Sequence, residues 1–256
     1  MHSENRTALV TGAAGTMGLA VVKAFLEEGS TVVLVDINAD GLSKLTGELG
    51  AKTHGYAFDI SDPEAVKVNM AKIAAEVGDI DILVNNAGIL SNNKTVETTP
   101  EEWNRVMSVN LNGAFYLSQA VLPSMRRKKW GRIINTSSYA AKSGGLTAGT
   151  AYSVSKAAII GLTFSLAAET TGDGITVNGI APAYVKTPMV MEQLTAEQRA
   201  EIEKKIPVGR FCEPEEFAHV VKFLASPLSG FITGEIIDQA ALHGFLKRVR
   251  DLGMPL

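Results

Sequence analysis

Short runs of apolar and β-branched residues alternate along the chain with longer segments in which apolar residues recur every three or four positions. The short runs predict buried strands at 7–11, 31–36, 53–59, 80–85, 131–137, 175–181 and 234–239. The longer segments predict helices at 17–28, 38–49, 62–77, 100–127, 151–170 and 214–225. Near-continuous apolar strands separated by helices are typical of a parallel sheet covered on both faces, and crossovers between parallel strands are right-handed. We therefore expect an α/β, doubly wound fold.

Proline and acidic residues mark where several of these helices begin. Thr99-Pro100-Glu101-Glu102 has the pattern of a capping box with proline at the first helical position, and Pro63 and Pro214 repeat the proline start. No linker rich in proline, glycine or serine interrupts the alternation, so the sequence predicts one domain over residues 1–256.

Two segments fall outside the alternation. Residues 186–210 form an insertion before the last predicted helix, which we interpret as a substrate loop or lid; the alternative is a surface helix without a role. Residues 242–256 form a C-terminal tail, which either reaches a neighbouring subunit or is loosely ordered.

Composition narrows the function classes. Of the 256 residues 46% are apolar, which is enough for a sizeable core, and the net charge of −3 favours neither nucleic acid nor an anionic membrane as a partner. The single cysteine, Cys212, and four histidines without ligand spacing predict neither an internal disulfide nor a metal site. The N-terminal MHSENR lacks the apolar stretch of a signal peptide, and the longest apolar stretch, AAIIGLTFSLAA, is short of the ~20 residues that span a bilayer. We expect a soluble, cytoplasmic protein with no membrane contact.

A glycine-rich turn, TGAAGTMG at 11–18, connects the first strand to the first helix and contains Gly12, Gly15, Thr16, Met17 and Gly18. A turn of this kind holds dinucleotide phosphates, because glycine lets the backbone approach them and the helix N-terminus offers unpaired N–H groups. Asp36 ends the second strand, where a carboxylate accepts hydrogen bonds from a ribose 2′-hydroxyl and repels a 2′-phosphate. Neither Ala14 nor Ile37 is the arginine that a phosphate would need, so the sequence predicts NAD rather than NADP. The alternative for Asp36 is a helix N-cap or turn residue.

The start of the helix at 151–170 carries candidate chemistry. Tyr152 and Lys156 are four residues apart, on one helix face. A neighbouring ammonium lowers the pKa of a phenol, which then exchanges a proton with an alcohol or ketone while hydride moves to or from a nicotinamide. Ser137 and Ser138, at the end of the fifth strand, are candidates to bind the substrate oxygen. Asn110 lies inside a predicted helix, where asparagine is mildly unfavourable, so we expect it to have a specific role.

Two further strand ends carry short polar or small residues. Asp59-Ile60-Ser61-Asp62 follows the third strand and Asn85-Asn86-Ala87-Gly88 the fourth. The small residues allow a flat ligand to approach the backbone, and Asp62 is equally able to cap the next helix.

Together, NNAG at 85–88, Asn110, SS at 137–138, YSVSK at 152–156 and PAYVKT at 182–187 resemble the motifs of the short-chain dehydrogenase/reductase family, in order from about residue 6 to 239. The resemblance implies a Rossmann fold with a seven-stranded parallel sheet flanked by helices, and a homo-oligomer, tetramer or dimer. It implies that Tyr152 is the general acid/base, that Lys156 lowers its pKa and holds the nicotinamide ribose, and that Asn110 anchors a water in the proton relay. Ser138, the second serine of the strand-end motif, would position the substrate oxygen in preference to Ser137.

The same resemblance assigns the cofactor contacts. Asp59 would contact the adenine, the stretch from Asn86 to Gly88 would line the cofactor, and Val185 with Thr187 would hold the carboxamide. The predicted NAD-binding set is Gly12, Gly15, Thr16, Met17, Gly18, Asp36, Asp59, Ile60, Asn86, Ala87, Gly88, Tyr152, Lys156, Pro182, Val185 and Thr187.

Three features depart from the family pattern. The usual loop, TGxxxGxG, would place glycine at Thr16; the TGxxGxxG found here resembles the extended relatives of the family. We expect Thr16 to cap its helix or to donate its hydroxyl to phosphate, with strain only if its φ is positive. Ala183, and Ala240 with Ala241, stand where glycines are usual, which bears on cofactor affinity and assembly.

The predicted function is NAD-dependent interconversion of a secondary alcohol and a ketone, on a small polyol, sugar or hydroxy acid. Tyr139, Lys142, Tyr184, Met189 and Met191 are expected at the border of the pocket, with Lys142 either meeting an anionic substrate group or solvated. The alternative is a non-catalytic NAD-binding or structural protein of the same fold. A methyltransferase-like protein is disfavoured because it has no need for Tyr152 and Lys156 on one helix face.

Overall fold

The computed structural model describes residues 6–145, 147–204, 206 and 208–238. Seven parallel strands form one sheet in the order β3-β2-β1-β4-β5-β6-β7. The strands are β1 (Thr7–Thr11), β2 (Thr31–Asp36), β3 (Thr53–Ala57), β4 (Ile82–Asn85), β5 (Gly131–Thr136), β6 (Ile175–Ala181) and β7 (Ile236–Asp238). This confirms the doubly wound α/β fold, with some strands one to three residues shorter than predicted. Ala240, Ala241 and the tail at 242–256 lie outside the described residues.

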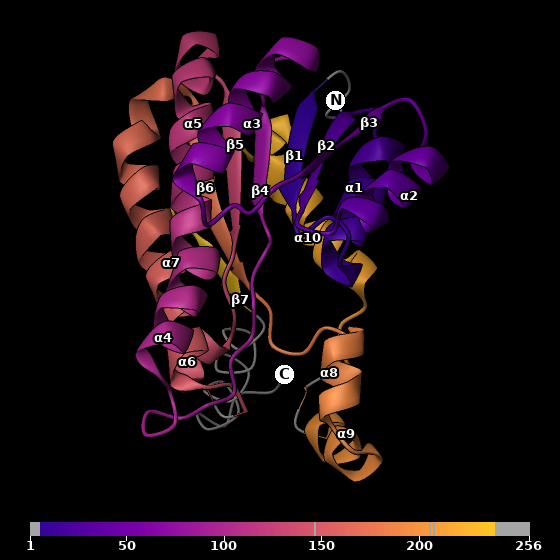
Figure 1. The fold of residues 1–256 in the computed structure, drawn as a ribbon, viewed down its shortest axis with the longest axis vertical. Helices are drawn as coiled ribbons and strands as arrows, with labels where there is room; N and C mark the ends of the chain where they lie inside the picture. Colours follow the sequence, from indigo (N-terminus) through magenta and orange to yellow (C-terminus); the bar gives the residue numbers. More distant parts are fainter. Residues whose placement is uncertain (1–5, 146, 205, 207, 239–256) are drawn as a thin grey trace, which may run out of the picture.

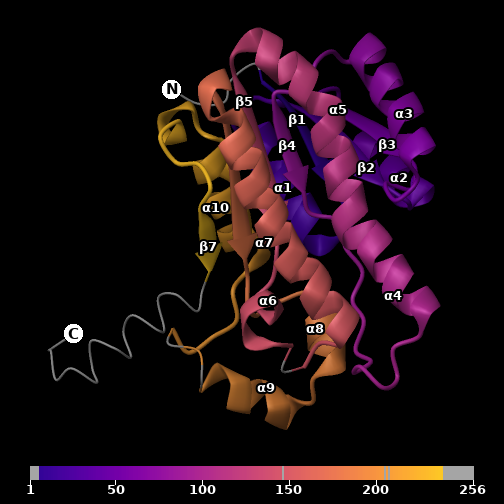
Figure 2. The same ribbon diagram turned by 90° about the vertical axis from the view of Figure 1, so that its left-hand side faces the viewer.

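Helices cover both faces of the sheet (Figures 1 and 2). On one face lie α1 (Thr16–Glu27), α2 (Ala39–Leu49) and α10 (Pro214–Ala225); on the other lie α3 (Pro63–Glu76), α4 (Pro100–Met107), α5 (Gly113–Lys128) and α7 (Thr150–Thr170). Each layer has its own apolar core, the first around Phe25 and Phe217 and the second around Leu117 and Ile133. Burial on both faces explains why the strand sequences are almost entirely apolar.

The predicted helix starts lie within one residue of the observed ones. The Asp62 side chain accepts from Glu64 N at 2.9 Å and caps α3, so the capping role left open for Asp62 is confirmed. Thr99 accepts from Glu102 N at 3.2 Å and caps α4. The helix predicted at 100–127 is continuous but contains a π-helical turn, Ser108–Asn112, between α4 and α5. Such turns are frequent at functional sites, and this one carries Asn110.

The helix α7, with the 3₁₀ turn that follows it, is longer than its apolar stretch suggested. Thr150–Asp173 is long and apolar enough, by length and composition alone, to cross a membrane, so the expectation that this stretch is too short was wrong. Leu166 and Ala167 of the helix are buried in the second core, as expected of the core helix of a folded domain.

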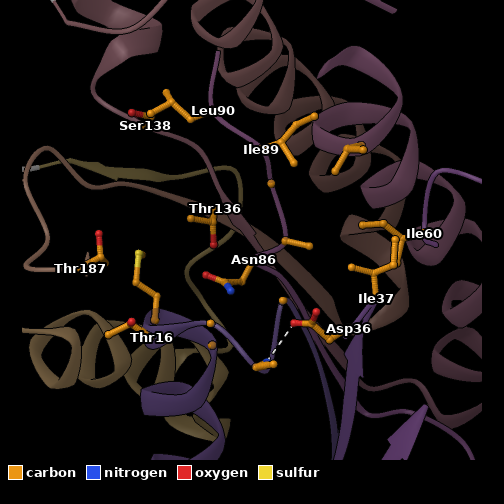
Figure 3. A pocket seen from close by; sticks show the side chains of 18 of the residues that line it. Thr16, Asp36, Ile37, Ile60, Asn86, Ile89, Leu90, Thr136, Ser138 and Thr187 are labelled. Atoms are coloured by element: carbon orange, nitrogen blue, oxygen red, sulfur yellow. Dashed lines mark hydrogen bonds between the residues drawn. The ribbon is translucent and has the colours of Figure 1, made fainter. Parts of the chain in front are cut away.

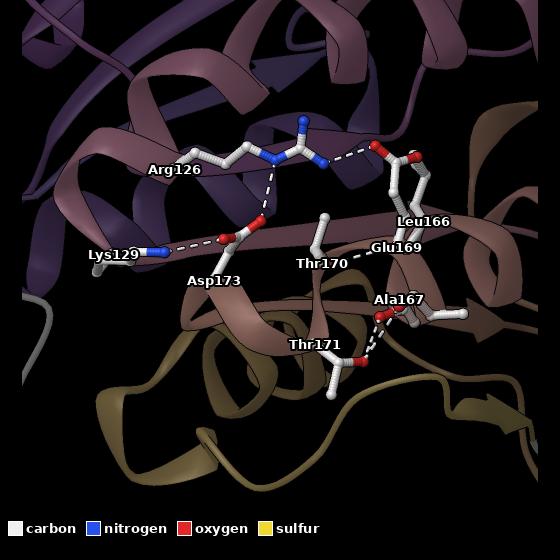
Figure 4. Close-up of polar contacts among 9 residues, drawn as sticks. Arg126, Lys129, Leu166, Ala167, Glu169, Thr170, Thr171 and Asp173 are labelled. Carbon is white, nitrogen blue, oxygen red and sulfur yellow. Dashed lines mark hydrogen bonds and ion pairs between the residues drawn. The ribbon is translucent and has the colours of Figure 1, made fainter.

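A network of ion pairs joins the C-terminal ends of α5 and α7 (Figure 4). Arg126 contacts Glu169 at 2.6 Å and Asp173 at 3.0 Å, and Lys129 contacts Asp173 at 3.0 Å. Because these groups are largely exposed, the network fixes the geometry of the helix pair more than it adds stability.

The insertion at 186–210 contains two helices, α8 (Pro188–Gln193) and α9 (Ala196–Glu203), where the sequence analysis gave a surface helix only as the alternative. They lie beyond the carboxyl ends of the strands (Figures 1 and 2). The base of the insertion is closed by Cys212, whose N–H donates to Tyr184 O at 2.9 Å and whose carbonyl accepts from Lys186 N at 2.8 Å. The role of this segment as a substrate loop stays a prediction.

Candidate active site

The turn between β1 and α1 depends on two of its three glycines for its shape. Gly12 has a φ of +64°, and a Cβ there would lie 3.0 Å from the Cα of Ala87. A Cβ on Gly18 would collide with the carbonyl group of Gly12. Gly15 differs, because a Cβ there would meet only the Gly12 oxygen, at 3.3 Å, and the residue faces the open side of the turn. The first and last glycines shape the loop, and Gly15 keeps its surface free of side-chain atoms.

Thr16 sits in this turn without strain. Among the described non-glycine residues only Lys129 has a positive φ, so the backbone penalty considered for Thr16 does not arise, and Ala183 is equally unstrained. Gly15 is the N-cap of α1, and no side chain caps the helix, so the expectation that Thr16 caps its own helix was wrong. Its side chain points into the space above the turn (Figure 3). The role of a phosphate donor therefore remains the prediction for Thr16.

Asp36 faces the glycine turn from the end of β2 (Figure 3). Its Oδ2 accepts from Ala14 N at 3.0 Å and its Oδ1 from Asn38 N at 3.1 Å. The helix cap is Asn38, which accepts from Gly41 N at 3.0 Å, so Asp36 is a turn residue but not the N-cap. The Asp36 carboxylate thus links the end of β2 to the turn after β1, and the predicted cofactor would lie across both.

The end of β4 is fixed against β1 by Thr11, a residue to which the sequence analysis gave no role. Thr11 Oγ1 accepts from Asn86 N and from Ala87 N, both at 2.9 Å, and Asn86 Nδ2 donates to Thr11 O at 3.0 Å. The strand order reverses between these two strands, which is where ligands of this fold class bind.

Tyr152, Lys156 and Ser138 meet at the ends of β5 and α7. Lys156 Nζ donates to Thr136 O at 2.8 Å and lies 5.8 Å from the centre of the Tyr152 ring. Ser137 is buried and its hydroxyl donates to Lys156 O at 2.7 Å, whereas Ser138 faces the open space and accepts from Ala140 N at 3.2 Å. Of the two serines, only Ser138 has its hydroxyl directed toward the side where Tyr152 lies, which supports the choice made from the motif.

The electrostatics of this cluster differ from the expectation. Burial lowers the pKa of the Lys156 ammonium to about 8. Burial also raises the pKa of the Tyr152 phenol, and the hydrogen bond with Ser138 opposes this only in part. The prediction of a lowered phenol pKa was therefore wrong: desolvation disfavours phenolate, and the ammonium is directed at the Thr136 carbonyl.

The hydrogen bonds of the Asn110 side chain explain why an asparagine stands inside a helix. Its Oδ1 accepts from Ile89 N at 2.8 Å, and its Nδ2 donates to Ile89 O and to Ser155 Oγ, each at 3.0 Å. The side chain thus ties the loop after β4 to α7. A Cβ on Gly88 would lie 3.2 Å from both Asn110 Oδ1 and Lys156 Nζ, so this glycine allows the loop to pass close to both. The water-anchoring role of Asn110 stays a prediction.

A pocket of about 620 Å³ at the carboxyl ends of the strands brings these groups together; we call it the strand-end pocket. Figure 3 shows its wall. Every predicted catalytic or cofactor-binding residue lines it except Asn110. The sequence analysis missed the lining residues Val35, Asn38, Phe58, Ile89, Leu90, Arg105, Val109, Thr136, Pro188 and Val190. Most are apolar or lie on loops and carry no motif; Arg105 had no signal beyond being a charged helix residue.

Four of the residues expected at the pocket border are not among those that line it. Tyr139, Lys142, Tyr184 and Met191 do not line the strand-end pocket, and the side chain of Met189 lies outside the described part. Lys142 forms an ion pair with Asp238, whose carboxylate is buried, while the Lys142 side chain itself stays 45% exposed, so the solvated alternative fits better than contact with a substrate. Across the residues that the structure describes, no group of three histidine, cysteine or acidic side chains could hold a metal.

Comparisons with known proteins show which family this chain resembles. The family model described as Enoyl-(Acyl carrier protein) reductase matches residues 12–239, and a domain of unknown function matches residues 227–256. The chain is 39% identical to the 3-oxoacyl-(acyl-carrier-protein) reductases of Thermotoga maritima, over 240 residues, and Escherichia coli, over 238. These alignments cover 93% of this chain and 97% and 96% of the relatives. A crystal structure of 3-oxoacyl-(acyl-carrier protein) reductase from Brucella melitensis superposes with a TM-score of 0.86 at 37% identity, covering 92% of this chain and 90% of that one.

Proposed function

The chain belongs to the short-chain dehydrogenase/reductase family, and from this premise we propose that it is an NADH-dependent reductase of 3-oxoacyl thioesters. It is an oxidoreductase of a family that binds a nicotinamide dinucleotide. The observation that carries the proposal is the strand-end pocket itself, with a glycine turn at one end and Tyr152, Ser138 and Lys156 at the other.

The turn fits a dinucleotide. Its backbone is left bare at Gly15, and α1 begins with no side chain capping its first turn, so the first N–H groups are available to an anion. The positive end of the helix dipole adds to this preference for phosphate. The variant TGxxGxxG loop is therefore consistent with a working phosphate site.

Asp36 supports NAD over NADP. Its carboxylate lines the pocket, beside the exposed Ile37, and is held by the N–H groups of Ala14 and Asn38. Among the described lining residues the cations are Arg105 and Lys156, and Arg105 is paired with Asp59. A 2′-phosphate would meet a carboxylate with no free guanidinium beside it.

The residues at the other end supply a proton. When bound, the dinucleotide would supply the hydride needed to reduce the carbonyl carbon of the substrate. Because burial keeps the Tyr152 phenol protonated, it can donate its proton to the carbonyl oxygen, and Ser138 holds that oxygen by a hydrogen bond. One hydride and one proton convert the ketone to a secondary alcohol, and oxidation is the reverse. The protonated phenol is the form of Tyr152 that acts in the reductive direction.

The substrate class comes from the relatives. Those reported above are named for 3-oxoacyl groups, so the polyol, sugar or hydroxy acid expected from the sequence is replaced by a 3-oxoacyl thioester. Leu90, Pro188 and Val190 supply an apolar wall suited to an acyl chain. Assembly as a tetramer or dimer and a cytoplasmic location stay part of the proposal.

A substrate panel tests the proposal. Absorbance at 340 nm would follow NADH consumption with acetoacetyl-CoA and, in separate reactions, NADH formation from NAD with a polyol and with a 2-hydroxy acid. We expect turnover with the thioester and little with the alcohols. Rapid oxidation of the polyol would overturn the substrate class. NADH binding without turnover on any substrate would favour the non-catalytic alternative.

A further inference from the structure

An ion pair between Arg105 and Asp59 forms part of the lining of the strand-end pocket. Arg105 lies on α4, and its Nη1 is 3.2 Å from Oδ2 of Asp59, which follows β3. Both side chains line the pocket. Phe58 N donates to Asp36 O at 3.2 Å, so this pair adjoins the strand end that carries the predicted ribose-binding carboxylate.

The hydrogen bonds of the Asp59 carboxylate leave one of its acceptor positions unused. Its Oδ1 accepts from Ser61 N at 2.9 Å and from Ser61 Oγ at 2.6 Å, and its Oδ2 accepts from Arg105. A carboxylate offers about four acceptor positions, two on each oxygen. Three are used, and the fourth is on Oδ2, the oxygen that Arg105 holds.

The same contacts keep Asp59 an acceptor. Burial raises the pKa of the Asp59 carboxyl, but the hydrogen bonds from Ser61 and from Arg105 outweigh it and hold the pKa below its usual range. The neighbouring residue, Ile60, is apolar and fixed in place. A Cβ on Gly113 would lie 2.7 Å from the Ile60 side chain, so Ile60 packs directly against the backbone at the start of α5. This part of the pocket thus combines an apolar surface with one directed anionic acceptor.

We propose that Arg105 is a positioning residue that aims the free lone pair of Asp59 at the exocyclic amino group of adenine. An ionised acceptor fixed in this way binds a base with an amino donor and repels a base with a carbonyl oxygen at the same position. The inference rests on the proposed dinucleotide site and on the adenine contact that the family resemblance assigns to Asp59. Its new element is the selection of the base by a residue of α4.

Titration of nicotinamide fluorescence with two dinucleotides tests this role. The probes are NADH and reduced nicotinamide hypoxanthine dinucleotide, in which an oxygen replaces the adenine amino group. Wild type should bind NADH about tenfold more tightly. Arg105→Met should weaken NADH binding about three- to tenfold and leave the hypoxanthine form within about twofold, because the pair is partly exposed.

Three further variants sharpen the result. Asp59→Asn should abolish or reverse the preference for NADH, since its amide can donate to the hypoxanthine oxygen. Adding Arg105→Met to Asp59→Asn should change little, as expected when one residue acts through the other. Arg127→Met is the matched control: Arg127 is exposed on α5 and paired with Asp79 at 3.5 Å, away from the pocket.

Several outcomes would overturn the role of Arg105. If Arg105→Met weakened the binding of both dinucleotides equally, Arg105 would have only a structural role. If both Arg105→Met and Arg105→Lys kept the full preference for NADH, Arg105 would have no role in selecting the base. A larger loss for NADPH than for NADH in Arg105→Met would make Arg105 a phosphate contact instead. If wild type bound no dinucleotide, the proposed function itself would fail, which is distinguishable because no preference would then be measurable. Thermal unfolding without ligand verifies that each variant is folded.

Discussion

The ammonium nitrogen of Lys156 donates a 2.8 Å hydrogen bond to the carbonyl oxygen of Thr136, the last residue of β5. The bond joins α7 to the sheet at the point where Tyr152 and Ser138 face the strand-end pocket. It also holds a cation in a buried position, where desolvation lowers the pKa of Lys156 to about 8. The geometry that serves the chemistry therefore has a cost in stability.

Lys156→Met should raise the free energy of unfolding at pH 7, on the order of 1–3 kcal/mol, because the buried charge is removed and the volume is kept. Between the folded pKa of about 8 and the ordinary value of 10.5, the unfolded wild type binds a proton that the folded protein has released. Wild-type stability therefore rises with pH across this window, relative to the variant, and the advantage of the variant shrinks. Guanidinium unfolding at pH 7 and pH 9.5 measures both effects. A variant that is less stable at pH 7, or a difference that does not change with pH, would contradict the prediction.

Gly15→Ala and Gly18→Ala should separate the two uses of glycine in the turn. A Cβ on Gly18 collides with Gly12, so Gly18→Ala should lower both the melting temperature and the affinity for NADH. A Cβ on Gly15 meets only one atom at 3.3 Å but protrudes where phosphate would sit. Gly15→Ala should therefore keep the melting temperature within a few degrees and weaken NADH binding tenfold or more, by the order of one lost charged hydrogen bond. Unchanged NADH affinity in Gly15→Ala would place the phosphates elsewhere.

Asp36→Asn should shift cofactor choice toward NADPH. The amide oxygen can still accept from Ala14 N, while the negative charge that repels a 2′-phosphate is gone. We expect the ratio of NADPH to NADH affinity to rise about tenfold or more in fluorescence titrations. Asp40→Asn, an exposed acidic residue in the first turn of α2, is the control and should leave the ratio unchanged. If both variants behave like wild type, another group sets the preference.

Lys94→Met should lower kcat and leave NADH binding intact. Lys94 Nζ donates to Gly145 O and to Ala148 O, both at 2.6 Å, and so ties the loop after β4 to the segment that precedes Tyr152. Loss of these bonds should loosen the start of α7 and reduce turnover of acetoacetyl-CoA several-fold, on the order of 1 kcal/mol in the barrier. Lys67→Met, an exposed lysine of α3 paired with Glu64, provides the comparison. A changed Kd for NADH with an unchanged kcat would contradict this positioning role.

The sequence was most informative where local rules decide the structure. Strand and helix positions follow from the period of apolar residues, and Pro63, Thr99 and Pro214 mark helix starts correctly because capping is a local interaction. The glycine turn and Asp36 were predicted because both lie at strand ends, which a parallel sheet brings to one edge. Local patterns also pointed to the serine pair and to Asn110, and the resemblance to a known family then favoured Ser138 over Ser137 and gave Asn110 a specific role.

Tertiary contacts account for what was missed. Arg105 and Asp59 are 46 residues apart in the sequence, and only the folded chain brings the segment after β3 close to α4. The pKa of Tyr152 was predicted from its neighbour in sequence, yet burial, which no sequence pattern shows, moves it the other way. Lys142 was judged from its own surroundings in the sequence, whereas its partner, Asp238, lies 96 residues away.

The most direct test of the proposed chemistry compares wild type and Tyr152→Phe in NADH-dependent reduction of acetoacetyl-CoA, with NADH affinity measured on the same samples. We predict that wild type oxidises NADH and that Tyr152→Phe binds NADH within about twofold but loses activity by about 10²-fold or more, the typical contribution of a general acid. Comparable rates in the two proteins would remove Tyr152 from the reaction and contradict the proposed mechanism.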